Sequence, residues 1–81
     1  MNAKDRKTLG ELLAKIDDAR IEIEEMKDEE QEKLDNQPES IQESEKGENW
    51  QALIDALDEF TSTLDQAHSD LTSTDGLEDV D

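Results

Sequence analysis

Residues 36–50, NQPESIQESEKGENW, lie between two segments whose apolar residues recur at helical spacing. Pro38 lacks a backbone N–H and cannot simply continue a helix, but it suits the first turn of a new one. The part PESIQES predicts about two helical turns in which Ile41 faces the flanking segments, and Gly47 predicts a break before the next helix. The chain is therefore expected to run as a long helix, a short helix or turn, and a second long helix.

The segment before this connector has apolar residues at alternating spacings of three and four, the pattern of a heptad repeat. The expected seam, meaning the line of residues that faces the other helix, is formed by Leu9, Leu12, Ile16, Ala19, Ile23 and Met26. The charged stretch KDEEQEK (residues 27–33) should stay helical by propensity but pack poorly. The predicted helix runs from about residue 5 to residue 35 and ends at Asn36 in the left-handed conformation. Three residues are candidate N-caps: Asn2, Asp5 and Thr8.

The segment after the connector repeats the same alternation over a longer stretch. Its expected seam is formed by Trp50, Leu53, Leu57, Phe60, Leu64, Ala67 and Leu71. This pattern predicts an amphipathic helix from about residue 49 to residue 71. The pair Asp75-Gly76 is typical of a turn, so residues 74–81 are expected to form a mobile acidic tail.

These elements predict an all-α fold, a helical hairpin of two long amphipathic helices. Residues 1–73 would form the single domain, with residues 36–48 as the connector; no segment shows a β pattern. A chain of 81 residues buries little surface, so its core is expected to be marginal. Two alternatives follow: a homodimer that forms a four-helix bundle, or a monomer that uses the connector as a third small element.

Charge is the dominant property of the composition, with 25 acidic and 8 basic residues and a net charge of −17. Residues 1–16 hold four basic and two acidic side chains, residues 17–48 hold four and fourteen, and residues 49–81 hold nine acidic side chains and no Lys or Arg. Such a chain should repel nucleic acid and anionic membranes and be attracted to a basic protein surface. No apolar run suggests a membrane span or a signal peptide, so a cytoplasmic protein is expected.

The sequence offers little support for catalysis or for cofactor and metal binding. There is no cysteine and no glycine-rich phosphate loop, and His68 is the only histidine. Asp65 and His68 are three positions apart and are expected to form a solvated pair on the helix surface. We therefore expect a protein that is not an enzyme and that has no cofactor and no metal site.

Rows of carboxylates are the remaining feature with functional meaning. Side chains three or four positions apart on a helix lie about 5–6 Å apart, and phosphates along a nucleic-acid strand have a comparable spacing of roughly 6–7 Å. The rows are Glu22, Glu25, Asp28, Glu29 and Glu32 on the first helix, and Asp55, Asp58, Glu59, Asp65 and Asp70 on the second. Both are expected to point away from the seam, the second with no cation among its members. They would either imitate a phosphate backbone or only keep the protein soluble.

The connector also carries a resemblance to known proteins. The run DEEQEKLDNQPESIQESEKGE (residues 28–48), followed by LIDALDEF (residues 53–60), resembles a family of small acidic helical proteins encoded by tailed phages and prophages. Members of that family join a charged helix to an NLPESLQ-S-E-GE-like connector, in which Gln37 here replaces an apolar residue. The function of the family is unsettled, so the resemblance implies a phage setting in a host bacterial cell.

A second and more local resemblance concerns PES (residues 38–40) and IQES (residues 41–44), which are similar to stretches of the phage inhibitors of uracil-DNA glycosylase. Those inhibitors are acidic DNA mimics with a mixed α/β fold. The resemblance implies that Glu39, Ser40, Glu43 and Ser44 would occupy a DNA-binding groove, while a notch near Ile41 and Trp50 would receive a protruding side chain.

Two functions are thus expected from the sequence. The first is a DNA-mimic inhibitor that blocks the basic cleft of a host DNA-binding enzyme, with uracil-DNA glycosylase as the best single target. The alternative is a helical oligomerisation or adaptor protein in phage assembly. The candidate partner-binding residues are Glu25, Asp28, Glu29, Glu39, Ser40, Ile41, Glu43, Ser44, Trp50, Asp55, Asp58 and Glu59.

Overall fold

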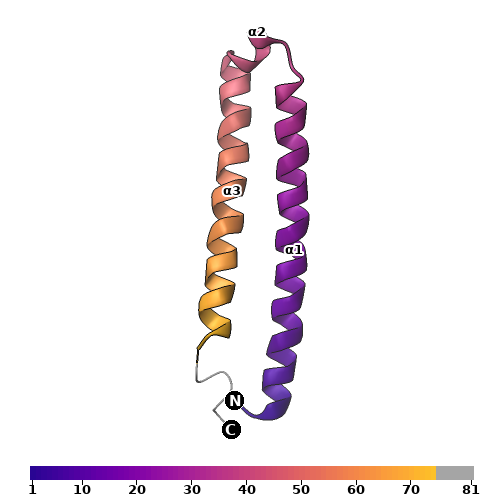
Figure 1. Ribbon diagram of the computed structural model, residues 1–81, viewed down its shortest axis with the longest axis vertical. Helices are drawn as coiled ribbons and strands as arrows, with labels where there is room; N and C mark the ends of the chain where they lie inside the picture. The colour runs from indigo at the N-terminus through magenta and orange to yellow at the C-terminus, as the bar shows by residue number, and fades with distance from the viewer. Residues whose placement is uncertain (75–81) are drawn as a thin grey trace.

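The protein is a slender helical hairpin. The computed structural model describes residues 1–74, in which α1 (Ala3–Asp35), α2 (Glu39–Gln42) and α3 (Glu45–Thr72) follow one another. The long helices α1 and α3 run antiparallel, and the short α2 joins them at one end of a rod that measures 60 × 16 × 13 Å (Figure 1). The predicted all-α hairpin is confirmed. The Asp75-Gly76 turn and the predicted tail beyond Thr74 lie outside the described residues.

Local capping sets both ends of α1. Asn2 is the N-cap, since its Oδ1 accepts a hydrogen bond from the backbone N–H of Asp5 at 2.8 Å. At the other end Asn36 has φ −86° and ψ −3°, so the predicted left-handed conformation is wrong. The chain leaves the helix through a tighter right-handed turn, in which the N–H of Gln37 donates to the carbonyl oxygen of Leu34 at 3.0 Å.

The connector is more helical than the sequence suggested. Pro38 precedes the first turn of α2, and Ser44 is the N-cap of α3, with its Oγ accepting from the N–H of Gly47 at 3.2 Å. Gly47 therefore lies inside the first turn of α3 and does not break the chain. It is buried because α2 crosses close to it, and an added Cβ would overlap the carbonyl oxygens of Ile41 and Gln42.

The line along which the two long helices meet keeps alternate members of the predicted seams, such as the half-buried Ile23, Leu57 and Leu64, and replaces the others by the residue that follows each of them. Leu34 and Ile54 are 4% exposed and Thr61 is 1% exposed, and none of these three belonged to the predicted seams. Four residues of the predicted seams are about half exposed: Leu12 (49%), Met26 (61%), Leu53 (54%) and Phe60 (53%). In their place, α1 directs Arg20 and Lys27 into the contact, where both side chains are half-buried.

The physical reason is the width of the apolar stripe. Two helices in contact bury only a narrow line on each partner, and the apolar stripe of each helix here is wider than that line. Arg and Lys can occupy the edge of such a line, because their aliphatic stems pack while their charged ends reach water. In the described part of the chain, no helix is both long and apolar enough to cross a membrane.

Candidate interaction surfaces

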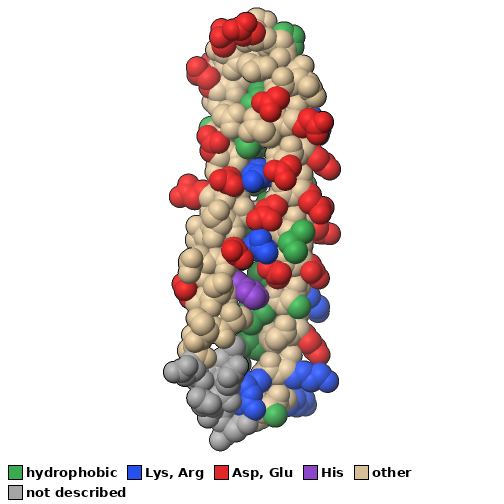
Figure 2. Space-filling model, viewed as in Figure 1, with side chains coloured by type: hydrophobic (Ala, Val, Ile, Leu, Met, Phe, Trp, Pro, Cys, Tyr) green, Lys and Arg blue, Asp and Glu red, His purple; other side chains and the backbone are tan. Residues whose placement is uncertain are grey.

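One side of the hairpin, here called the polar face, is held together by charged and amide side chains. It consists of Asp17, Arg20, Glu24, Lys27 and Gln31 on α1, and Gln51, Asp58 and Asp65 on α3. Figure 2 shows basic side chains in the groove between the helices with carboxylates around them, and further basic side chains near the end where the chain begins.

Arg20 joins three carboxylates across this groove. Its guanidinium donates to Asp17 at 2.9 Å and to Glu24 at 3.0 Å on its own helix, and lies 3.8 Å from Asp65 on α3. The hydrogen bond to Asp17 and the surrounding negative charge raise the pKa of Arg20 above its ordinary value. Arg20 therefore fastens α1 to α3 with its charge fully retained.

Lys27 makes the second connection, with Nζ 3.0 Å from Asp58 Oδ1, and this hydrogen bond raises the pKa of Lys27. One helical turn further along, Gln31 and Gln51 exchange two amide hydrogen bonds of 3.2 and 3.1 Å. The expectation that the second row of carboxylates points away from the seam is thus wrong for Asp58 and Asp65, because cations from the first helix reach them.

The candidate residues outside this groove fall into two groups. Along the shaft, Glu25, Glu29 and Glu59 are exposed and have no cation within 4 Å among residues 1–74. Asp55 accepts a hydrogen bond from Gln51 at 3.0 Å, and Asp28 lies 3.7 Å from Lys27. The shaft therefore presents outer carboxylates that the groove cations do not neutralise.

The connector residues gather at the tip of the rod. Glu39, Ser40 and Glu43 are exposed there, while Ile41 is half-buried. Ser44 has a structural role, because its hydroxyl donates to the carbonyl of Ile41 and also caps α3. The structure brings these residues together but separates them along the rod from the shaft group.

Sequence reasoning missed Glu30, which fixes the tryptophan beside the tip. Trp50 Nε1 donates to Glu30 Oε2 at 2.9 Å, and Lys33 lies 3.1 Å from the other oxygen. The bonds from Lys33 and then Trp50 lower the pKa of Glu30 below its ordinary value. The signal was present in the sequence, because Glu30 occupies the next seam position after Met26.

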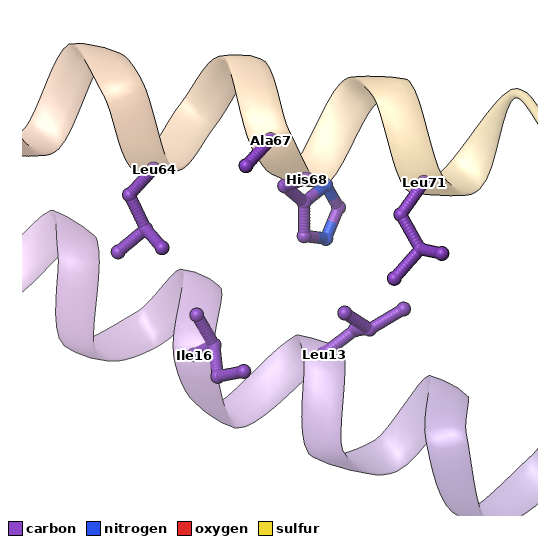
Figure 3. A pocket seen from close by; sticks show the side chains of 6 residues that line it. All are labelled: Leu13, Ile16, Leu64, Ala67, His68 and Leu71. Atoms are coloured by element: carbon purple, nitrogen blue, oxygen red, sulfur yellow. The ribbon is translucent and has the colours of Figure 1, made fainter.

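A shallow apolar pocket of about 160 Å³ lies between α1 and α3 (Figure 3). Its lining consists of Leu13, Ile16, Leu64, Ala67, His68 and Leu71. The predicted surface pair of His68 with Asp65 is wrong, because Asp65 turns to Arg20 on the polar face and His68 is half-buried in the pocket wall.

Within residues 1–74 no group of three or more acidic or histidine side chains is arranged to hold a metal ion. Comparison of the chain with protein-family models, with curated proteins and with solved structures found no match. The functional argument therefore rests on the surfaces described above.

Proposed function

We propose that this protein is a DNA mimic that occupies the basic DNA-binding cleft of a host bacterial enzyme. The observation that supports the proposal is the division of charge between groove and surface. Arg20 and Lys27 are used inside the groove, so the outer shaft retains uncompensated acid. On α3 alone, Lys46 is the single cation among the charges of a 28-residue helix.

The outer carboxylates are spaced in a way that a phosphate-binding surface can accept. Glu25 and Glu29 are one turn apart on α1, as are Asp55 and Glu59 on α3, which corresponds to about 5–6 Å between neighbouring side chains. A cleft lined by Lys and Arg exchanges counterions for phosphates when it binds DNA, and it gains similarly from a row of carboxylates. Association would be fast at low salt and would weaken as salt increases.

The tip is the part of the rod best suited to confer specificity. Glu39 and Glu43 are exposed on either side of Ser40, and Ile41 lies beneath them. Together with the resemblance of PES and IQES to the inhibitors of uracil-DNA glycosylase, this makes that enzyme the first target to test.

The test is competition for DNA. Purified uracil-DNA glycosylase is bound to a fluorescent uracil-containing oligonucleotide, and displacement by the protein is followed by anisotropy at low and at high salt. We expect displacement that falls with salt. The double substitution Glu39→Lys with Glu43→Lys should weaken displacement at least about tenfold, because the loss of a charge pair buried in an interface can cost about 2 kcal/mol or more.

A matched control changes the net charge equally at a distant site. Glu11→Lys with Asp18→Lys alters two exposed carboxylates in the half of α1 that is farther from the tip and should leave displacement nearly unchanged. If both double variants lost displacement equally, the effect would be one of net charge alone, and recognition by the tip would be contradicted. Absence of displacement from this enzyme and from a panel of basic DNA-binding enzymes would overturn DNA mimicry.

The second candidate, an oligomerisation or adaptor protein, is favoured by a different observation. Leu53 and Phe60 on α3 and Met26 on α1 are more than half exposed, although they belong to heptad repeats. Large exposed apolar side chains at regular spacing are typical of an interface. This surface is separate from the acidic tip, and the two candidates can be tested independently.

A further inference from the structure

The side of the hairpin opposite the polar face is an uncovered apolar surface. The contacts Lys27–Asp58 and Arg20–Asp65 show that a residue directly after a seam residue in the sequence lies on the polar-face side of the rod. The positions that precede the seam on each helix therefore share the other side. This apolar face consists of Leu12, Ala19 and Met26 on α1, and Leu53, Phe60 and Ala67 on α3.

The pocket borders this apolar face. Ala67 belongs to the face itself, and Ile16, Leu64 and Leu71 occupy the seam positions next to it. Leu13 and His68 line the pocket from the seam positions nearer to the polar face, and no residue of the polar face contributes to the lining (Figure 3). Ile16 is 43% exposed and Leu71 39% exposed, so the hairpin alone leaves this hollow unfilled.

The pocket has the size of an aromatic ring. Its volume is about 160 Å³, and an apolar cavity of about 150 Å³ is known to accept benzene. The chain has one phenylalanine, Phe60, which is 53% exposed on the same apolar face. Phe60 does not line the pocket of its own chain: it lies one turn before Leu64, the first α3 residue of the pocket wall, and about 10 Å by the helical rise before Ala67.

The register of the hairpin shows which arrangement of two copies brings them together. Asp65 lies between Phe60 and the centre of the α3 wall of the pocket, and it is level with Arg20 near the middle of α1. Consider a two-fold axis that is perpendicular to the rod and crosses it at this level. Such an axis places Phe60 of one copy opposite the pocket of the other copy. The same axis gives the greatest overlap of the two rods, since it passes close to their midpoint.

We propose that a second copy of this chain covers the apolar face in an antiparallel orientation, with Phe60 of each copy inserted into the pocket of the other. The product is a four-helix bundle in which each exposed heptad stripe is buried. This inference goes beyond the proposed inhibitory function and does not depend on it, because the acidic tip and outer shaft carboxylates remain outside the interface.

Charge complementarity favours the antiparallel orientation. Residues 1–16 hold four basic and two acidic side chains, whereas residues 17–48 hold four basic and fourteen acidic ones. In the antiparallel dimer the open end of one copy, where α3 adds Asp65 and Asp70 to these basic side chains, lies beside the more acidic connector end of the other. A parallel dimer would place the two acidic ends together, which costs electrostatic free energy.

The available area is sufficient for a specific dimer. A rod of 60 by 16 Å offers a face on the order of 900 Å² per copy, compared with the roughly 800 Å² per partner of a standard interface. Four of its six side chains are large, exposed and apolar (Leu12, Met26, Leu53 and Phe60), and apolar residues of this kind are typical of homodimer interfaces.

The test measures mass and orientation. Sedimentation equilibrium should give twice the 9.2 kDa of the chain for the unmodified protein. Phe60→Glu should raise the dissociation constant at least about 30-fold, as for a central aromatic hot spot, while circular dichroism stays helical. The matched control is Ile21→Glu, which alters an exposed isoleucine (41%) on the polar-face side of α1 and should leave the dimer intact.

Orientation is measured with a spin label on Ser40→Cys, since the chain has no native cysteine and Ser40 is exposed at the tip. Antiparallel copies place the two labels close to the 60 Å length of the rod apart. A short distance would overturn the antiparallel arrangement. A monomer at all concentrations, or a dimer that Phe60→Glu leaves unchanged, would overturn the proposal, and neither result bears on displacement of DNA by the acidic tip.

Discussion

The two halves of the hairpin differ in how well they are packed. The loop half (residues 27–58, between the Lys27–Asp58 pair and the connector) contains the apolar residues Leu34 and Ile54, each 4% exposed. The open half (residues 3–20 and 64–72) contains the pocket. The sequences of both halves are amphipathic, but only the loop half closes over its core.

The difference shows what a third element contributes. In the loop half α2 lies against the first turn of α3, and Trp50 is fixed by Glu30. In the open half α1 and α3 have only each other, and two helices cannot bury a stripe wider than their line of contact. The loop half therefore buries a core within one chain and leaves only Leu53 of the apolar face exposed, whereas the open half also leaves a pocket that a second copy would fill.

The largest expected effect is the removal of a core side chain from the loop half. Ile54→Ala should lower the free energy of unfolding by about 3 kcal/mol, as for other buried aliphatic truncations. Leu71→Ala in the open half should cost less than about 1 kcal/mol, since much of that side chain is already in contact with water. Urea unfolding followed by circular dichroism, at one protein concentration, measures both values.

Equal losses at Ile54 and Leu71 would show that the open half is as well packed as the loop half. Making both changes in the Phe60→Glu background separates packing within the chain from packing between copies, because association itself adds to apparent stability.

A smaller effect is expected from the crossing of α2 and α3. Gly47→Ala should destabilise the protein by about 2 kcal/mol, because the new methyl group overlaps backbone oxygens that cannot move away like a side chain. The control is Gly10→Ala: Gly10 is exposed in the middle of a helical turn of α1 with nothing within 4 Å of an added Cβ. That change should stabilise the protein by about 1 kcal/mol through helix propensity.

Thermal unfolding should show a lower Tm for Gly47→Ala and a higher Tm for Gly10→Ala if α2 and α3 are in close contact at Gly47. A stabilising Gly47→Ala would contradict the close approach of α2 to the first turn of α3.

The smallest effect concerns Glu30 and depends on pH. Folding lowers the pKa of Glu30, so the ionised side chain stabilises the native state above the ordinary glutamate pKa of about 4.3, and this contribution is lost as the pH falls through the lowered value. Glu30→Gln should therefore have a lower Tm than the unmodified protein at pH 7, and the difference should shrink as the pH falls below the ordinary glutamate pKa. A Tm difference that does not change with pH would assign the effect to shape instead of charge. Fluorescence of Trp50, the only tryptophan, reports the same contact.

The sequence predicted the helices well because helix formation depends on neighbouring residues. Asn2 was among the expected caps, Pro38 marked the reversal, and the three–four alternation located both long helices. The start of α3 was missed by four residues, because Gly47 was interpreted through its low helix propensity. Its actual role is to allow the close approach of α2, and a sequence pattern within one helix does not show where α2 runs.

The candidate surfaces were predicted less completely. Exposure of Glu39, Glu43 and the outer shaft carboxylates agrees with the expectation, whereas Asp58, Asp65 and His68 have different neighbours from those expected. Their neighbours come from the other helix, and a pattern along one helix does not specify which residues of the second helix it meets.

The sequence by itself therefore determined that this protein is a hairpin of two long helices with a large excess of acid. The tertiary structure alone decided which part of each apolar stripe is buried. Consecutive residues differ by about 100° around a helix. The predicted and the observed lines of contact therefore differ by a rotation of each helix about its axis, and both lines bury apolar residues. The rotation observed is the one in which Arg20 and Lys27 pack their stems in the seam and reach Asp65 and Asp58 across it, leaving Phe60 on the open side.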